Sequence, residues 1–518
     1  MPIPKPAWTT SLAELPGSAA FRSPDAVAVV AGRRRLTFDE LDRAAAGVAD
    51  DLVYRGLDPG DPVGLLAGNG VEFPVAAYGI LRAGGVLVPL PPSAPVAELR
   101  GLLRAARVEV VLSDPANADL AWAAAQAYDA RCGAVVVDGE AAASAGDLVS
   151  VRSMARLQRP EPVAPVRAGS RAVILFSSGS GDHPKGVVHS HEGLLHNARC
   201  VALEMLRLTA DDVLLGALPL AHSYGLSAVL NAAMVAGARI ELIPKFDAGK
   251  AWSTIADRGV TVFSGVPTMF RRLVLHPHSS RNTDLRLCVV SGAPCPRDLA
   301  RDVQLRLGTP LIERYGMTEA SPLTWHTVDP ASAEGDVGRA AWGVRVRAVD
   351  VDRNPVAPGR VGELQVRAPS MLLGYLSAED EHEALTDGWL LTGDLGKVHP
   401  GARVELVGRL KDVILRGGYS VSAREVARAL EEHPAVVEAA VVGVPDGDLG
   451  EEVAAAVVLA ARSGISLEDL NFHAAKTLAA WKRPHRWRIV ERLPRTALEK
   501  VSAQEVRRMF AGEPAEPV

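Results

Sequence analysis

The chain has 518 residues, of which 48% are hydrophobic and 23% charged, and its formal net charge is −5. This size predicts more than one domain, the composition is that of a folded protein, and the slightly acidic balance gives no general attraction to nucleic acid. No apolar run reaches the length of a membrane span, no secretion signal opens the chain, and four cysteines lack metal spacing. We therefore expect a cytoplasmic protein with no membrane span.

Helices and strands alternate along the first hundred residues. Thr37 is a predicted helix N-cap, with Glu40 completing a capping box, and an apolar strand is predicted at 63–67. A further helix ends at the glycine turn of 84–85, which leads into an apolar strand at 86–90. Helix, glycine turn and strand in this order are typical of a parallel sheet packed with helices.

A loop rich in serine and glycine follows the apolar strand predicted at 172–176. Hydroxyls, backbone N–H groups and an ammonium can hold a polyphosphate, and the loop offers them through Ser177, Ser178, Gly179, Ser180 and Lys185. A Walker loop is excluded because Lys185 is followed by glycine, and the dinucleotide fingerprint is excluded because Pro184 replaces its third glycine. On this segment alone a plain surface loop remains the alternative. After it, Ser190 is a predicted N-cap, and apolar residues recur at helical spacing from 194 to 206.

This loop resembles the signature of the adenylate-forming superfamily, which comprises acyl-CoA synthetases, luciferases and the adenylation domains of peptide synthetases. The match covers Ser177 to Ser180 and Pro184-Lys185-Gly186. The resemblance extends over most of the chain, from about residue 20 to about residue 510. It implies that Lys185 and the loop hydroxyls hold the β- and γ-phosphates of ATP.

Two residues of the loop depart from the family pattern. Gly181 and Asp182 stand where the family usually has Thr and Gly. A carboxylate about 4 Å from a phosphate charge is repelled by roughly 1 kcal/mol in water, and a missing hydroxyl costs roughly 0.5–1.5 kcal/mol of hydrogen bonding. We expect Asp182 to point outward and the Michaelis constant for ATP to be raised.

The segment 218–225 resembles the family's Pro-Leu-Phe-His motif, which borders the acyl pocket. A lone histidine there is either structural or part of the pocket. The resemblance implies an acyl pocket bordered by His222, Ser223, Gly225, Gly265, Val266 and Met317. Amino-acid adenylation domains place an Asp early in this segment, and 224–228 has none, so an amino acid is not expected. The small residues suggest room for a hydrophobic acid: a fatty acid, an aryl acid or a polycyclic natural-product acid.

Three further motifs resemble the family's nucleotide site. Small residues at Gly292, Ala293 and Pro294 match its adenine loop, where they let the flat base approach the backbone. The motif Tyr315-Gly316-Met317-Thr318-Glu319 implies that Tyr315 packs on adenine, Thr318 reaches phosphate and Glu319 holds Mg²⁺. Asp394 matches a residue that contacts ribose, although beside Gly393 it also suits a plain turn, and Arg409 matches one that contacts ribose or phosphate.

The last hundred residues resemble the family's small lid domain. The resemblance implies a large domain over 1–408, a hinge at 409–411 centred on Lys411, and a mobile α+β domain over 412–518. A hairpin is predicted around Gly417 and Gly418, which would border a CoA tunnel, and Ser422 to Glu425 is a predicted capping box for a helix over 423–432.

Lys500 matches the catalytic lysine of the lid domain. The family has Gly before this lysine, whereas here Glu499 precedes it, and an exposed surface lysine is the alternative. Only nine of the 56 basic residues are lysines, and Lys185, Lys411 and Lys500 are among them. That scarcity suggests that these three sites need a compact ammonium.

These residues together predict an α/β enzyme, with a large domain of mostly parallel sheets packed with helices and a small mobile α+β domain. The implied activity is an ATP-dependent acyl-CoA synthetase that uses Mg²⁺, ATP and CoA, makes an acyl-AMP with release of pyrophosphate, and then forms the thioester. One alternative performs only one half-reaction and works with a carrier protein or a second ligase in natural-product biosynthesis. Another is a degenerate relative that only binds nucleotide or acyl-AMP. The oligomeric state stays open, a homodimer included.

Overall fold

A computed structural model describes residues 10–126, 131–136, 149–150, 166–177, 184–277, 283–326, 335–378, 384–416, 419–446, 449–460, 463–495 and 501–511. Its internal contacts divide the chain into two compact units. The first, called the large unit, consists of the chain up to Val346 together with Val366–Leu390 and Pro400–Val404. The second, called the small unit, consists of Arg347–Gln365, Leu391–His399 and the chain from Glu405 onward. The hinge expected at 409–411 stays a prediction.

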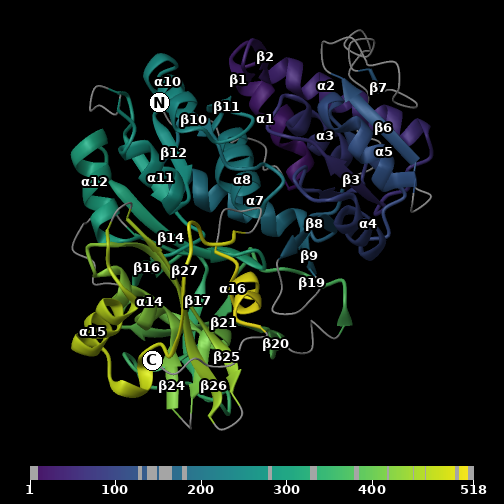
Figure 1. Ribbon diagram of the computed structural model, residues 1–518. Coiled ribbons are helices and arrows are strands. Elements are labelled where there is room, and N and C mark those ends of the chain that lie inside the picture. The colour runs from purple at the N-terminus through teal and green to yellow at the C-terminus, as the bar shows by residue number, and fades with distance from the viewer. Residues whose placement is uncertain are drawn as a thin grey trace. The chain divides into compact units, whose positions relative to one another are not determined.

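An eight-stranded sheet in the large unit carries the serine-rich loop. Its strand order is β19-β9-β8-β4-β3-β5-β6-β7, and β4, β3, β5, β6 and β7 continue in parallel from β8. At the other end β9 and β19 are antiparallel (Figure 1). The bounds are β3 Pro62–Leu66, β4 Val86–Pro89, β5 Val110–Ser113, β6 Arg131–Val136, β7 Val149–Ser150, β8 Arg171–Ser177, β9 Lys185–Ser190 and β19 Gly374–Tyr375.

A second sheet of the large unit has six parallel strands at its centre, in the order β14-β13-β12-β10-β11-β1. Antiparallel strands extend it, β2 beside β1 and then β15 and β16 beyond β14. The mostly parallel large domain that the sequence predicted is confirmed. The bounds are β1 Val27–Ala31, β2 Arg34–Thr37, β10 Val213–Gly216, β11 Arg239–Leu242, β12 Val262–Gly265, β13 Leu287–Val290, β14 Leu311–Met317, β15 Ala320–Trp325 and β16 Asp336–Ala340.

Two helices of the large unit, α2 and α7, begin where local capping predicts. Thr37 caps α2 in a full capping box with Glu40, and the Ser190 hydroxyl accepts a hydrogen bond from the backbone N–H of Gly193 at the start of α7. The bounds are η1 Leu12–Glu14, α1 Leu15–Arg22, α2 Phe38–Tyr54, α3 Glu72–Arg82, α4 Val96–Ala105, η2 Pro115–Asn117, α5 Ala118–Gln126, α7 His191–Arg199, η3 Cys200–Met205, α8 Ser223–Gly225, η4 Leu226–Asn231, α9 Ala232–Ala236, α10 Ala248–Asp257, α11 Pro267–Val274 and α12 Arg297–Leu307.

The last part of the chain is a five-stranded sheet covered on both faces. Along β26 the side chains of Val453, Ala455 and Val457 belong to one apolar cluster, and those of Ala454 and Ala456 to another, as the period of two in a strand requires. Helices α14 and α15 cover the first cluster and α16 the second. The strands are β23 Val413–Arg416, β24 Tyr419–Ser422, β25 Val436–Asp446, β26 Gly450–Leu459 and β27 Arg486–Ile489, and the helices η5 Leu410–Asp412, α14 Ala423–Glu431, α15 Leu467–Thr477, η6 Ala480–Lys482 and α16 Ala503–Met509.

The capping box predicted at Ser422 is only half formed. The Ser422 hydroxyl accepts from the Glu425 N–H, as an N-cap should. The Glu425 carboxylate, however, pairs with the Lys482 ammonium at 2.5 Å, so it does not return to the Ser422 backbone. The ion pair with Lys482, a residue far away in the sequence, thus replaces the local hydrogen bond of the capping box.

Four strands are divided between the two units. They follow one another in the order β17-β18-β21-β22, and β20 pairs with β21. The bounds are β17 Arg345–Val349, β18 Val361–Arg367, β20 Leu385–Thr386, β21 Trp389–His399 and β22 Arg403–Arg409.

Among the described helices, none combines the length and apolar character needed to cross a membrane.

Candidate active site

The serine-rich loop connects two antiparallel strands. Ser177 ends β8, Lys185 begins β9, and the two residues pair across the hairpin. Predicted phosphate-binding residues Ser178, Gly179 and Ser180 lie outside the described residues, as do Gly181 and Asp182. The hairpin nevertheless shows that the loop leaves a buried strand and returns beside it, which holds its two described ends together.

Glu319 brings three motifs into one cluster. Its carboxylate is 7% exposed and accepts a hydrogen bond from the Tyr375 hydroxyl at 3.3 Å. Burial raises the pKa of Glu319, while its own backbone N–H, Tyr375, the Lys185 charge and the Ser177 hydroxyl act in the opposite direction. The Lys185 ammonium also lies 5.8 Å from the centre of the Tyr375 ring. The carboxylate of Glu319, in the motif of 315–319, thus interacts with the residues at both ends of the serine-rich loop, Ser177 and Lys185.

Tyr375 and His189 belong to this site and were not predicted from the sequence. Tyr375 lies on β19, which pairs with β9 and so brings the hydroxyl to Glu319. His189 is 2% exposed, and its Nε2–H donates to the carbonyl oxygen of Thr318 at 2.8 Å. Burial lowers the pKa of His189 to about 4, so the ring is neutral at neutral pH. Its place in the apolar strand β9 was the available signal for a buried histidine.

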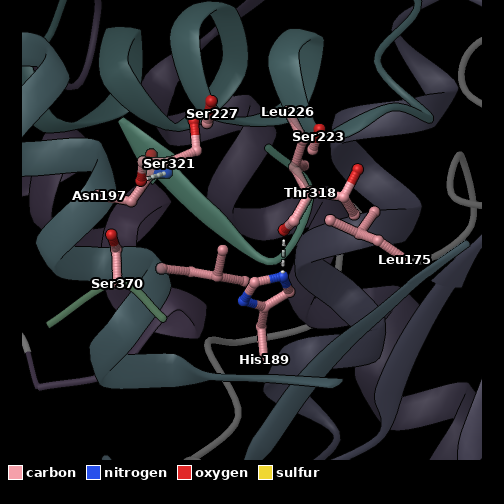
Figure 2. Close-up of a pocket in the computed structure, with 10 residues that line it drawn as sticks. Leu175, His189, Asn197, Ser223, Leu226, Ser227, Thr318, Ser321 and Ser370 are labelled. Carbon is pink, nitrogen blue, oxygen red and sulfur yellow. Dashed lines mark hydrogen bonds between the residues drawn. The ribbon is translucent and has the colours of Figure 1, made fainter. Parts of the chain in front are cut away.

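A small cavity lies beside this cluster. Figure 2 shows Ser227, Ser321 and Asn197 on one side of it and Thr318, Ser223 and Leu175 on the other, with His189 bonded to Thr318. Of the predicted site residues, Ser223 and Thr318 line it. The rest of its lining is Leu194, Leu226 and Ser370.

Two glycines that suggested a roomy acyl pocket are explained by packing. A Cβ on Gly225 would lie 2.1 Å from the backbone oxygen of Pro219. A Cβ on Gly265 would lie 3.1 Å and 3.2 Å from the rings of Phe263 and Phe270. Gly225 is therefore required by a backbone contact, and Gly265 lies in tight contact with two rings, so packing within the fold accounts for both without reference to the substrate.

Most of the remaining predicted residues of the large unit lie on or just after its strands, and His222 lies before a helix. Val266 follows β12 and Met317 ends β14, while Tyr315 pairs with Thr324 of β15. His222 precedes α8, where its backbone carbonyl accepts from the N–H of Leu226. Carboxyl ends of parallel strands are where ligands bind in such sheets.

The predicted adenine loop follows β13. Gly292 has a φ of +86°, a conformation that favours glycine. Ala293 and Pro294 after it are exposed. The loop thus offers exposed backbone with small side chains, as contact with a flat base requires.

In the small unit, the two residues predicted to contact ribose lie together. The Nε of Arg409 is 3.1 Å from Oδ1 of Asp394, whose side chain is 9% exposed. The turn at Gly393 has a φ of +69°, and its N–H donates to Glu363 at 3.2 Å. Burial raises the pKa of Glu363, and the charge of Asp394 acts in the same direction.

The predicted lid residues are described only at their borders. Lys500, Gly417 and Gly418 lie outside the described residues, and Lys411 is described as part of η5. The flanks of 496–500 are joined, because Arg495 pairs with Val501 and the Ser502 N–H donates to the carbonyl of Pro494 at 2.9 Å. Arg495 is further held by both carboxylate oxygens of Glu438, at 2.7 and 2.8 Å.

Among the described residues, no group of three or more His, Cys, Asp or Glu could hold a metal ion. A single buried carboxylate, Glu319, nevertheless fits Mg²⁺ when the substrate's phosphates supply the other ligands. The hydroxyl and ammonium around it are suited to phosphate oxygens.

Comparison with known proteins identifies the family. The model of the AMP-binding enzyme family matches residues 18–376, and that of the AMP-binding enzyme C-terminal domain matches residues 425–500. A feruloyl-CoA synthase of Amycolatopsis sp is 33% identical over 96% of this chain and 99% of its own. A sulfoacetate–CoA ligase of Cupriavidus necator is 32% identical over 90% of this chain and 91% of its own.

Solved structures extend the agreement to the fold. ATP-bound MatB from Rhodopseudomonas palustris has a TM-score of 0.88 and 31% identity, and the match covers 96% of this chain and 99% of that one. An anthranilate CoA ligase in complex with anthranoyl-AMP has a TM-score of 0.85 and 25% identity, over 96% of this chain and 97% of that one. The chain therefore belongs to the AMP-binding enzyme family of the adenylate-forming superfamily and is an acid–thiol ligase of the acyl-CoA synthetase type.

Proposed function

We propose that this enzyme activates a carboxylic acid with ATP through an acyl-AMP and then transfers the acyl group to CoA. The observation that carries the proposal is the meeting of Ser177, Lys185 and Glu319 next to a cavity that Thr318 lines. The side chains suited to bind phosphate therefore lie next to a cavity that can hold part of an organic acid. A carboxylate oxygen placed there can attack the α-phosphorus while pyrophosphate leaves.

The residues contribute position and charge rather than a covalent intermediate. Lys185 and the loop hydroxyls of 177–180 hold the β- and γ-phosphates, and Lys500 serves the α-phosphate and the incoming carboxylate. The neutral His189 holds the backbone of Thr318, so that the Thr318 hydroxyl is directed at the phosphate. Tyr375 orients the Glu319 carboxylate through its hydrogen bond.

Adenosine is held by residues of three motifs. Tyr315 and the exposed loop Gly292-Ala293-Pro294 contact adenine, and Asp394 with Arg409 contacts ribose. Glu319 would hold Mg²⁺, whose charge neutralises the phosphates when it is bound. Glu319 is 7% exposed, so little bulk water reaches its carboxylate.

For the second half-reaction we propose a rotation of the lid domain about Lys411. Lys500 leaves the site, and the backbone of Gly417 and Gly418 borders the passage for pantetheine. The CoA thiolate then attacks the acyl carbonyl, and AMP leaves.

We further propose that the enzyme works in the cytoplasm. The described cysteines Cys200, Cys288 and Cys295 are free thiols, which suits a reducing compartment.

Family membership leaves the acid open. Relatives of similar identity are named for feruloyl, sulfoacetate and long-chain fatty acid substrates, which share little beyond one carboxylate. The predicted hydrophobic acid is therefore one candidate class. The cavity's own residues, four of them serines, are the better guide.

The test is pyrophosphate release from ATP with a panel of acids, measured with and without CoA. The expected result is acid-dependent release and CoA-dependent thioester. Glu319→Gln and Lys185→Met should reduce release by at least tenfold, whereas Lys250→Met, at an exposed lysine on α10, should not. Release without any thioester would instead indicate an adenylate-only enzyme. Thioester from supplied acyl-AMP, with no release from any acid, would indicate a ligase for the second half-reaction only.

A further inference from the structure

Arg314 is a buried cation without a carboxylate partner among the described residues. It lies in β14 and is 3% exposed. Its Nη2 donates to the hydroxyls of Ser321 and, at 3.5 Å, Ser227, while Nε and Nη1 have no acceptor. The guanidinium also lies 4.9 Å from the centre of the Tyr224 ring. None of these contacts carries a negative charge.

An arginine stays protonated when it is buried, so its charge must be compensated by its surroundings. The free energy needed to bury an unpaired charge is larger than the stabilisation that contacts with one aromatic ring and two hydroxyls provide. Burial lowers the pKa of Arg314, which is the sign of an uncompensated site. The structural arginine Arg286 shows the usual solution, because its guanidinium pairs with Asp212 at 2.7 Å.

The hydroxyls that Arg314 holds face the cavity. Ser227 and Ser321 both line it, next to Asn197, whose Oδ1 has no donor although it is buried. Figure 2 shows these three residues together on one side, across from Thr318. The cavity therefore has a cationic, hydroxyl-lined side and a side at the phosphate motif.

We propose that the acid that this enzyme activates carries a second anionic group, a carboxylate or a sulfonate, which binds at Ser227 and Ser321 and compensates the charge of Arg314. This inference rests on the proposed function, which places the reacting carboxylate near Thr318. The second anion then defines the opposite end of the substrate. Arg314 is a specificity-determining residue and takes no part in the reaction at phosphorus.

The size of the cavity limits the length of the acid. In this conformation it has room for about one water-sized molecule. Its remaining walls include Leu175, Leu194 and Leu226, which suit a short apolar linker between the two anionic ends. Any organic acid must widen this cavity, and a short diacid requires less widening than a fatty acid or a polycyclic acid.

The experiment compares each diacid from malonate to adipate with its own monomethyl ester, and adds sulfoacetate and a series of straight-chain fatty acids. The measurement is kcat/KM for pyrophosphate release, together with the shift in melting temperature that each acid causes. We expect a short diacid or the sulfonate to exceed its uncharged counterpart by roughly ten- to a hundredfold, as for a hydrogen bond to a charged group. The carboxylate and sulfonate arms show which anion is preferred.

Arg314→Met tests the residue itself. It should remove that preference by the same factor while activity on the monomethyl ester persists, and Arg314→Lys should restore part of it. Because each ratio is taken within one variant, partial unfolding does not mimic the result. Arg286→Met is the control: it breaks an ion pair in the same unit, lowers the melting temperature and leaves the ratio unchanged.

The outcomes separate the inference from the proposed function. Fatty acids or monoesters that exceed every diacid and the sulfonate, in both assays, would overturn the inference and leave the function standing. If no acid releases pyrophosphate but a diacid still raises the melting temperature of the native protein and not of Arg314→Met, the function fails and the anion site stands. A preference for the diacid that survives Arg314→Met would also refute the role of this arginine.

Discussion

Acid should destabilise the large unit through His189, and the structure gives both the sign and the size of the effect. His189 is 2% exposed, and burial lowers its pKa from 6.5 to about 4. In the unfolded chain the same ring binds a proton below a pH of about 6.5. The unfolded state therefore holds more protons between these two values, and folding stability is lost as the pH falls from 6.5 towards 4.

The full shift corresponds to about 3 kcal/mol, and the part lost between pH values of about 7.5 and 5 is about 2 kcal/mol. His191, which is 1% exposed, has its pKa lowered to about 4 by the same cause and adds a loss of the same sign in the same window. Carboxylates with lowered pKa values, such as Asp212, act at lower pH and do not mimic this window. Carboxylates with raised pKa values, such as Glu319 and Glu363, act in the opposite direction, so the contribution of His189 is taken as the difference from a variant that lacks only this ring.

The assay is urea unfolding, followed by circular dichroism, of the native protein and His189→Gln at both pH values. Glutamine keeps an N–H donor for the carbonyl of Thr318 but does not titrate, so the variant should resemble the native protein at the higher pH. At the lower pH it should be more stable by about 2 kcal/mol. An equal loss of stability in both proteins would refute the neutral, buried state of His189.

Other substitutions test the proposed cycle and the packing. Lys500→Ala should abolish adenylation but spare thioester formation from supplied acyl-AMP; equal loss of both steps would indicate a structural lysine. Lys411→Pro should do the reverse, because proline fixes φ at the hinge, and normal turnover with CoA would exclude Lys411 as the pivot. Gly181→Thr combined with Asp182→Gly should lower the Michaelis constant for ATP without changing transfer from acyl-AMP, and an unchanged constant would show that these departures do not weaken ATP binding. Gly225→Ala should lower the melting temperature sharply, since its Cβ would meet a backbone oxygen at 2.1 Å; an unaffected melting temperature would contradict that contact.

Local chemistry determined much of this protein from the sequence alone. The capping box of Thr37 and Glu40, the N-cap at Ser190 and the hairpin of β23 and β24 are formed as predicted, because each depends on residues within a few positions of one another. The family motifs likewise indicated the fold class and the reaction class. Ser177, Lys185 and Glu319 were assigned to the phosphate end of the site in this way, and the structure brings them together.

Tertiary structure decided what lies between the motifs. Glu425 left its local capping role for Lys482, and Gly225 and Gly265 are small because Pro219 and two phenylalanine rings lie against them. The bond from His189 to Thr318 joins residues 129 positions apart. The charge of Arg314, which has no carboxylate partner in the part of the chain that the structure describes, became visible only when strands and helices distant in sequence surrounded it. Burial and partnership are properties of the packed chain, so no pattern of neighbouring residues could have revealed them.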